Sequence, residues 1–555
     1  MVVIQGIVVD DIESNATAVI ERLDLEFGKI GWKVQWTIET KPNAAIHLIE
    51  ERPAFHLVVA DILYRREDLP GEKDEARYDI IESARERSKD TYILAVSSGD
   101  DSRRNLMSEA RRYGATRTLL RNQFSRESDE DNPRAIVRGI RDALVVAGVV
   151  RTLPVTPDPA RHPGVEVLLQ EVGSPTISEL YRRVLGLEDW GHRGAIRVGH
   201  LVRGASGARV CRVSTELPGV GVVHHVLKLG HDRALLQREA IRGANAARLL
   251  SQRFFVRHET TEPVGPVNGW WAIASLLVGE AIDFRTWIAG SPSQESVEMV
   301  LSGLLVDGLG QLYSANQQPT EDLALESLRF PGYRCLLVVA ALDYLAPAIS
   351  RIKPFGGAIE CQKAVRTLIS FCEEGILCGL TPRRSTPGNW RCLSHGDLHG
   401  GNVLVYRGNT PTPTLIDASE FGHAHWATDP ARLHVDLILR CAGKPEDSMF
   451  WDEFPAWRDR AETAAVDADD ATPDTGSAAD IAAFGAHWIS RNLARFALPA
   501  TLSQDRREYA WQWHAALAAQ YLRGTYQKDL PAPKRLLAAV AAHDQLRRAR
   551  AMVTG

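Results

Sequence analysis

Cysteine is scarce in this sequence, and the few cysteines are scattered. The chain has 7 cysteines in 555 residues, and no two of them form a C-x-x-C pair. Paired cysteines hold structural zinc or build the disulfide frameworks of small secreted domains. The sequence therefore predicts neither a zinc site nor a disulfide framework, and it favours a reducing, cytoplasmic setting.

Long hydrophobic runs and a strong net charge are also missing. The best candidate run, Cys335–Leu342, is much shorter than the ~20 residues of a membrane-spanning helix, and it ends at Asp343. The N-terminus lacks a basic segment and meets Asp10 and Asp11 at once, unlike a signal peptide. A net charge of −5 gives no general attraction to nucleic acid or anionic lipid. We therefore expect no membrane span, no signal peptide and no nucleic-acid partner.

What the sequence does have, in residues 1–150, is a regular alternation of apolar runs and helical patterns. Asn132 and Pro133 are typical of the N-cap and first residue of the last of these helices. Alternation of this kind predicts an α/β domain with a doubly wound parallel sheet. The predicted strands are Ile7–Val9, Val34–Ile38, Phe55–Ala60, Tyr92–Val96 and Thr118–Leu120.

Polar residues follow three of these predicted strands. Asp10 and Asp11 come after the first, Asp61 after the third, and Ser98 after the fourth. In a doubly wound sheet, functional residues gather at the carboxyl ends of the strands. Clustered carboxylates repel one another unless a divalent cation is present, and Mg²⁺ prefers oxygen ligands. The sequence therefore predicts a Mg²⁺ site at this edge of the sheet.

This part of the sequence resembles a response-regulator receiver domain of the flavodoxin-like class. The resemblance implies that Asp10 and Asp11 hold Mg²⁺, that Asp61 accepts a phosphoryl group, with a sensor histidine kinase as the possible partner, and that Ser98 reads the phosphorylated state. Arg121 stands where a receiver has a lysine, and a planar guanidinium does not replace a lysine point charge. The alternative is a receiver-like domain kept only for binding.

The segment Ser394–Val405, SHGDLHGGNVLV, carries the spacing H-x-D-x-x-x-x-N in His395, Asp397 and Asn402, and Asp417 follows after another apolar run. Phosphoryl transfer needs groups of these kinds. One carboxylate receives or orients the proton of an attacking hydroxyl, while an amide oxygen and a second carboxylate hold Mg²⁺ against nucleotide phosphates. The alternative is a surface hairpin rich in His and Gly. In that case the spacing of His395, Asp397, Asn402 and Asp417 would have arisen by chance.

This pattern resembles the aminoglycoside phosphotransferase and choline kinase branch of the protein-kinase-like superfamily. The resemblance implies that Asp397 is the catalytic base and that Asn402 and Asp417 are metal ligands. It also implies a bilobal α+β fold that binds ATP between its lobes and has a large helical lower lobe. Asp417 is followed by Ala418 and Ser419 rather than by Phe-Gly, as is usual in the small-molecule branch.

Four residues before the catalytic segment fit the upper lobe of such a fold. Gly204 and Gly207 lie in a turn where backbone N–H groups can approach phosphates. Lys228 stands in an apolar strand pattern, and Glu239 follows it early in a helical pattern. Kinases pair a strand lysine with a helix glutamate to hold the nucleotide phosphates. The alternative for Gly204 and Gly207 is an ordinary hairpin turn, and the alternative for Lys228 and Glu239 is a solvated surface charge.

After the catalytic segment, Asp429 opens a D-P-A-R-L run. That run looks like the helix start that follows the metal loop in aminoglycoside phosphotransferases. We expect Asp429 to cap this helix or to orient the catalytic loop rather than to take part in the chemistry.

These observations predict a receiver-like domain at 1–150, a Pro-rich linker at 151–165, a kinase-like upper lobe at 166–280 and a helical lower lobe at 281–555. The leading hypothesis is a signalling protein whose ATP- and Mg²⁺-dependent phosphotransferase acts on a hydroxyl of an unknown small molecule or protein. One alternative is a nucleotide-binding pseudokinase scaffold that the receiver controls. Another is antibiotic resistance, for which a fused receiver would be unusual.

Overall fold

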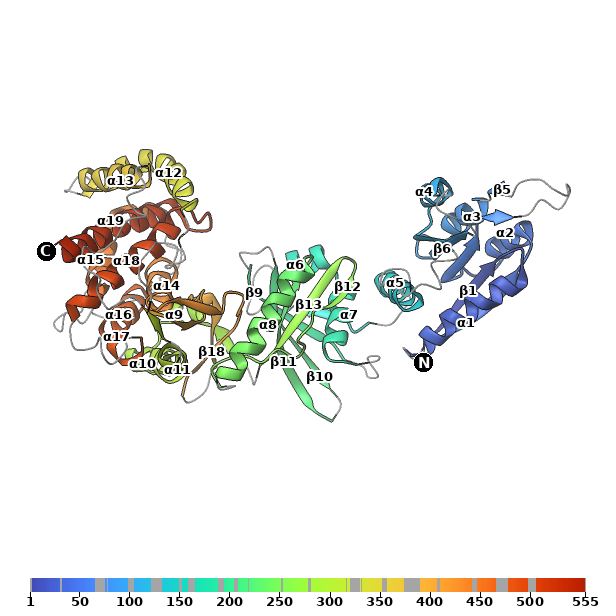
Figure 1. Ribbon diagram of the computed structural model, residues 1–555, viewed down its shortest axis with the longest axis horizontal. Helices are drawn as coiled ribbons and strands as arrows, with labels where there is room; N and C mark the ends of the chain where they lie inside the picture. The colour runs from blue at the N-terminus through green and yellow to red at the C-terminus, as the bar shows by residue number, and fades with distance from the viewer. Residues whose placement is uncertain are drawn as a thin grey trace. The chain divides into compact units, whose positions relative to one another are not determined.

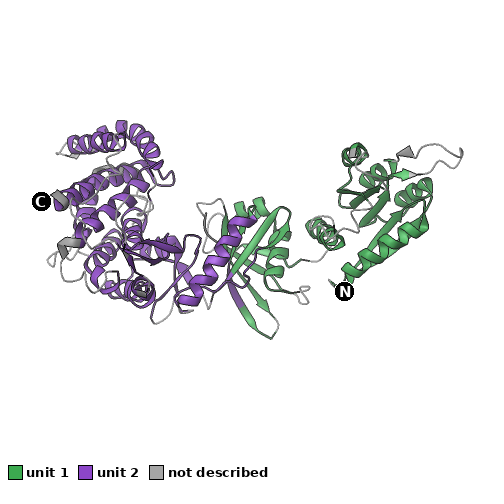
Figure 2. Ribbon diagram, viewed as in Figure 1, with its two compact units in different colours: residues 1–222, 227–232, 264–274 green, residues 223–226, 233–263, 275–555 purple. Residues whose placement is uncertain are grey.

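The computed structural model divides the chain into two compact units (Figure 2). Unit 1 holds residues 1–222, 227–232 and 264–274, and unit 2 holds residues 223–226, 233–263 and 275–555. The residues that the structure describes are 2–29, 32–64, 75–76, 78–97, 104–120, 132–148, 152–157, 165–187, 194–203, 208–217, 219–250, 253–277, 281–315, 317–319, 330, 332–351, 357–373, 390–406, 410–441, 447–465, 478–497 and 506–554.

The first sheet of unit 1 is the doubly wound parallel sheet that the sequence predicts. Its strands lie in the order β2-β1-β3-β6-β7, and every neighbouring pair runs parallel. Figure 1 draws this sheet in blue, with β1 and β6 labelled. The order starts near the middle of the sheet and steps outward to both sides, which identifies the flavodoxin-like arrangement. The bounds are β1 Val2–Val9, β2 Trp32–Glu39, β3 Leu57–Asp61, β6 Tyr92–Ser97 and β7 Arg117–Leu120.

Helices cover both faces of this sheet, because side chains alternate along each strand. Ile4 and Val8 of β1 pack in one hydrophobic cluster with α1 and α5, whereas Ile7 and Val9 pack in another with α2, α3 and α4. The helices are α1 Glu13–Lys29, α2 Pro42–Glu51, α3 Asp79–Arg87, α4 Arg104–Arg112 and α5 Pro133–Val146.

The start of α5 is as predicted. The side chain of Asn132 accepts a hydrogen bond from the backbone N–H of Ala135 at 2.8 Å, and Pro133 takes the first helical position. This cap satisfies a backbone donor that the first turn of the helix leaves without a partner.

A second sheet of six strands follows, and most of its residues belong to unit 1. The strand order is β12-β13-β11-β10-β9-β8. Helices α6 Val165–Val172 and α7 Ser174–Val184 share a hydrophobic cluster with these strands. The bounds are β8 Val155–Pro157, β9 Ile196–Arg203, β10 Arg209–Leu217, β11 Gly221–Gly230, β12 Val264–Val267 and β13 Trp270–Leu277.

Part of the predicted linker belongs to this second sheet. Strand β8 pairs in parallel with β9 at the edge of the sheet, so residues 155–157 are not a free spacer. Leu153, just before the strand, is buried in the cluster that also contains α6 and α7. An edge strand tolerates proline because one side of it donates no ladder hydrogen bonds, so the prolines did not prevent pairing.

Unit 2 is mostly helical and has its own large hydrophobic core. Its helix α18, Arg506–Thr525, buries Trp511, Trp513 and Tyr521 and packs against α19, Ala532–Thr554. The other α-helices of at least six residues that the structure describes in this unit are α8 Arg233–Leu249, α9 Phe284–Ala289, α10 Gln294–Ser302, α11 Gly310–Ala315, α12 Arg334–Leu345, α13 Gly357–Glu373, α14 Thr428–Asp436, α15 Asp447–Ala464 and α16 Ala478–Arg491.

Two small sheets of unit 2 carry residues 394–405, the predicted catalytic segment. One has the order β14-β17-β18 and the other β15-β16-β19. The bounds are β14 Ala281–Asp283, β15 Gln318–Pro319, β16 Trp390–Ser394, β17 Val403–Tyr406, β18 Thr412–Leu415 and β19 Gly422–His425.

Two absences expected from the sequence hold for the described residues. None of their helices is both long enough and apolar enough to cross a membrane. The six cysteines among them are buried and free of disulfides.

Candidate functional sites

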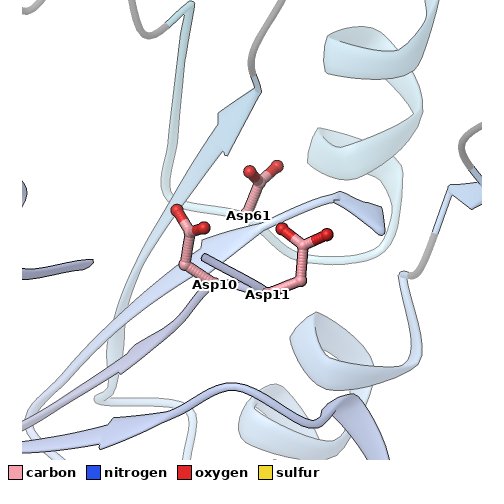
Figure 3. Close-up of side chains that lie close together, drawn as sticks. All are labelled: Asp10, Asp11 and Asp61. Atoms are coloured by element: carbon pink, nitrogen blue, oxygen red, sulfur yellow. The ribbon is translucent and has the colours of Figure 1, made fainter. Parts of the chain in front are cut away.

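The three carboxylates predicted at the edge of the first sheet lie together (Figure 3). Asp10 and Asp11 follow β1, and Asp61 ends β3, the parallel neighbour of β1, so the carboxyl ends of the two strands meet. Each residue offers one carboxylate oxygen, and the three oxygens lie within 4.8 Å of one another. Asp10 and Asp61 are each only 3% exposed, whereas Asp11 is half-buried.

Backbone hydrogen bonds fix two of these carboxylates. The N–H of Ile12 donates to Asp10 Oδ1, and the N–H of Leu63 donates to Asp61 Oδ1, both at 3.0 Å. Three carboxylates so close repel one another, and this donor set suits a divalent cation such as Mg²⁺. Ser98 and Arg121, the other predicted receiver residues, lie outside the described residues.

The catalytic segment runs from β16 through a short 3-10 turn, Gly400–Asn402, into β17. Its start is held by Asp429 in the first turn of α14. The Asp429 carboxylate accepts hydrogen bonds from the backbone N–H groups of His395 and Gly396 at 2.7 and 2.8 Å, and from the hydroxyl of Tyr313 at 3.2 Å. Of the two roles expected for Asp429, the structure therefore shows loop orientation, since Ala427 takes the N-cap position.

The end of the same loop is held by Asp436, the last residue of α14. Its carboxylate accepts a hydrogen bond from the backbone N–H of Gly400 at 2.8 Å, and Arg285 donates to both of its oxygens at 2.9 and 2.6 Å. Sequence analysis assigned no role to Asp436 or Arg285. A signal was present for Asp436, because residues seven apart, such as Asp429 and Asp436, lie on one face of a helix.

A hydrogen bond within the loop joins Asp397 and Asn402. The side-chain amide of Asn402 donates a hydrogen bond to the backbone carbonyl oxygen of Asp397 at 2.9 Å. The Asp397 side chain is 24% exposed, whereas Asn402 is 7% exposed. The Asp397 side chain is therefore half-buried, with its Oδ1 buried, and the loop that carries it is fixed by the hydrogen bond of Asn402.

Asp417 follows β18, as predicted, and it lies in a loop tied to the catalytic segment. The backbone N–H of Ile416 donates to the Asn402 carbonyl oxygen at 3.0 Å, and the His395 ring nitrogen Nε2 lies 2.9 Å from the Ile416 carbonyl oxygen. Asp417 has a φ of 60°, and the N–H of Ser419 donates to its Oδ1 at 3.2 Å. Left-handed backbone at a residue other than glycine costs energy and is concentrated at functional sites.

Two arginines that the sequence did not single out lie beside Asp397. Arg432 Nε is 3.2 Å and Arg523 is 3.8 Å from Asp397 Oδ1, while His399 Nε2 is 3.6 Å from Oδ2. Burial alone would raise the pKa of Asp397, but the charge of Arg432, together with His399 and Arg523, holds that pKa well below its ordinary value. The carboxylate is therefore ionised throughout the neutral range.

The predicted nucleotide-binding residues are described only in part. Lys228 lies in β11 and is 7% exposed, and Glu239 lies in α8 and is 4% exposed, so neither is a solvated surface charge. They belong to different units, and their pairing stays a prediction. Gly204 and Gly207 lie outside the described residues.

Comparison with known proteins finds similarity in solved structures alone. No family model matches the chain, and no curated protein matches it. A response-regulator receiver domain protein from Clostridium thermocellum matches 27% of this chain and 99% of its own length, with 11% identity and a TM-score of 0.20.

Two kinase structures match a larger part of the chain. An aminoglycoside phosphotransferase in complex with ADP and hygromycin B matches 69% of this chain and 98% of its own, with 12% identity and a TM-score of 0.31. An ethanolamine kinase from Plasmodium vivax matches 70% of this chain and 92% of its own, with 13% identity and a TM-score of 0.31. These scores are low, so the fold is assigned from the strand order and the loop geometry. In fold, the chain is a receiver-like domain followed by a kinase-like domain.

Proposed function

We propose that this protein is a signalling protein in which a receiver module accompanies an ATP- and Mg²⁺-dependent phosphotransferase that acts on a hydroxyl group. The observation that carries the proposal is the geometry of the catalytic loop. Asp429 and Asp436 hold its two ends through backbone hydrogen bonds, and the half-buried, ionised carboxylate of Asp397 lies in the loop between them. Fixed loops of this kind position charge, which is the main task of a protein in phosphoryl transfer.

Each residue of the site has a distinct task in this proposal. The Asp397 carboxylate accepts a hydrogen bond from the acceptor hydroxyl, orients it, and takes its proton as the new bond forms. The side-chain oxygens of Asn402 and Asp417 would hold Mg²⁺, which neutralises phosphate charge when bound. A backbone hydrogen bond from Ile416 to Asn402 joins the segments that carry these two side chains.

The receiver module has a proposal of its own. Asp61 accepts a phosphoryl group, with Asp10 and Asp11 completing a Mg²⁺ site. The supporting observation is that the three carboxylates approach within 4.8 Å from two neighbouring strands. A sensor histidine kinase is the partner that we propose for this reaction.

The proposed kinase activity is tested by titrating the full chain with ATP, with and without Mg²⁺, and by following ATP hydrolysis or autophosphorylation with γ-labelled ATP. We expect Mg²⁺-dependent binding and slow turnover, with water or a nearby hydroxyl replacing the acceptor. A folded protein that binds no ATP at about 1 mM, the upper end of ordinary KM values, would contradict the proposal. Binding without turnover would favour the pseudokinase scaffold.

A further inference from the structure

The surroundings of Asp397 carry more positive charge than the carboxylate can neutralise. Arg432 and Arg523 both approach its Oδ1, at 3.2 and 3.8 Å. In the part of the chain that the structure describes, Asp397 is the only carboxylate within 4.0 Å of either guanidinium. Two guanidinium groups therefore share one negative charge.

The pKa of Arg523 reflects this excess of positive charge. It is lowered to about 10, first by burial and then by the charges of Arg432 and Arg334, against the opposing effect of Asp397. Arg334 lies at the start of α12, whereas Arg432 lies in α14 and Arg523 in α18. Arg432 and Arg523 thus bring positive charge from two helices to one carboxylate, and an anion bound there would relieve their repulsion.

The hydrogen-bonding capacity of the two guanidiniums is also unused by the described residues. Arg432 Nε is buried and lacks a hydrogen-bond partner among them, because its approach to Asp397 Oδ1 has poor hydrogen-bond geometry. The side chains of Arg432 and Arg523 are 13% and 17% exposed. Each guanidinium carries five N–H donors in a planar fork that matches the oxygens of a carboxylate or a phosphate.

We propose that the phosphoryl acceptor is a small hydroxy compound that also carries a carboxylate or phosphate group, and that Arg432 and Arg523 hold this group beside Asp397. The inference rests on the proposed phosphotransferase function. Because both guanidiniums lie within 3.8 Å of the Asp397 carboxylate, only a few bonds need separate the acceptor's anionic group from its reacting hydroxyl. Polycationic amino sugars and choline would meet repulsion at this place.

The reaction balances as an ordinary phosphoryl transfer. The acceptor oxygen forms a bond to the γ-phosphorus while the bond from that phosphorus to the β,γ-bridging oxygen breaks. ADP leaves with the bridging oxygen, and Asp397 takes the hydroxyl proton. The arginines bind and orient the acceptor and do not exchange protons, since arginine stays protonated.

The first test incubates the full chain with γ-labelled ATP, Mg²⁺ and one candidate acceptor at a time. The acceptors are D-glycerate, glycerol 3-phosphate, choline and kanamycin. We expect labelled product from D-glycerate, from glycerol 3-phosphate, or from both, and the pair separates carboxylate from phosphate recognition. Label on choline or kanamycin and not on the anions would overturn the inference.

The second test uses arginine variants with the anion that reacts. Arg432→Gln and Arg523→Gln should each raise KM for that acceptor about tenfold or more, the usual effect of losing a hydrogen bond to a charged group, and leave KM for ATP unchanged. Arg523→Lys keeps the charge and should restore part of the loss. Arg460→Gln, which removes an ion pair to Asp480, is the matched control. An equal rise in KM for ATP would assign the arginines to the nucleotide and overturn the inference.

The third test needs no turnover. Calorimetric titration with glycerol 3-phosphate and with D-glycerate should show binding to the wild type and none to the variant that carries both Arg432→Gln and Arg523→Gln. No binding of either anion at about 1 mM would overturn the inference. A protein that binds these anions but never hydrolyses or transfers from ATP would contradict the proposed function while supporting the anion site.

Discussion

Arg141 of α5 and Glu179 of α7 form a buried ion pair, with 3.3 Å between Nε and Oε1. Glu179 also accepts hydrogen bonds from Arg182 and Arg183 of its own helix, and Arg183 reaches back to pair with Asp142 of α5. Helix α5 packs on the receiver sheet, and α7 packs in the cluster of the second sheet. Within unit 1, these charges therefore link the receiver-like domain to the helices that follow it.

Removing the central carboxylate of this network should destabilise unit 1. Glu179 is 2% exposed, and Glu179→Gln removes the carboxylate charge that Arg141, Arg182 and Arg183 share. We expect a loss of about 3 kcal/mol, the usual scale for breaking a buried ion pair. Urea unfolding of the full chain measures the loss. Glu171→Gln is the control because Glu171 is 35% exposed and pairs with Arg209, so it should cost less than about 1 kcal/mol. Equal losses for the two variants would contradict this account.

Unit 2 should lose stability as pH falls below neutral. Burial lowers the pKa of both His425 and His434 from 6.5 to about 3, so the folded state resists protons that the unfolded chain binds below pH 6.5. Stability should therefore fall between pH 6.5 and 3, by up to about 1.4 kcal/mol per pH unit for each histidine.

Melting temperatures of the wild type and of His425→Gln between pH 7 and pH 5 test this prediction. The variant should show a shallower dependence on pH, because it removes one of the two histidines whose pKa is lowered to about 3. His423→Gln, at an exposed position of the same strand, should keep the slope of the wild type. If the melting temperatures of His425→Gln and the wild type changed equally with pH, His425 would not contribute to the loss of stability at low pH.

Loss of the hydrogen bonds that Asp429 accepts should lower the rate of ATP hydrolysis. Asp429→Asn weakens the acceptors that hold the N–H groups of His395 and Gly396, so the loop carrying Asp397 shifts. Displacement of a catalytic group by about 1 Å costs on the order of 10² in rate. The comparison is ATP hydrolysis by this variant and by Tyr313→Phe, which removes a single hydrogen bond and keeps the loop contacts. A Tyr313→Phe defect as large as that of Asp429→Asn would argue against loop orientation.

Much of the architecture could be predicted because its signals are local. Apolar runs that end in Asp10 and Asp61 predict strands with carboxylates at their carboxyl ends. The short spacing from Asp397 to Asn402 predicts that one loop carries both residues. The arginine Arg523 could not be predicted, because it reaches Asp397 from a helix far away in the sequence. Strand β8 within the Pro-rich segment could not be predicted, because three residues carry too little pattern and the strand forms by pairing with β9.

The receiver proposal predicts a covalent modification. Incubation with acetyl phosphate and Mg²⁺ should add one phosphoryl group to the full chain, as seen by intact-mass spectrometry. Asp61→Ala should remove the modification, and Asp11→Asn should weaken its Mg²⁺ dependence, because the three carboxylates share one site. Asp90→Ala, in a turn on the same domain, should still be modified. If the wild type stayed unmodified while a control protein reacted with the same acetyl phosphate, the proposal that Asp61 is phosphorylated would be contradicted. The domain would then have a binding role only.

The central claim is that Asp397 acts on the acceptor hydroxyl while Asp417 acts through the metal, and comparing Asp397→Asn with Asp417→Asn tests it most directly. The measurement is Mg²⁺-dependent ATP affinity together with turnover of γ-labelled ATP. Asp397→Asn should bind ATP nearly as the wild type does and lose turnover by ~10² or more, the usual scale for a lost acid–base group. Asp417→Asn should weaken the Mg²⁺-dependent part of ATP binding as well as turnover. If Asp397→Asn kept the wild-type rate, the account would be contradicted.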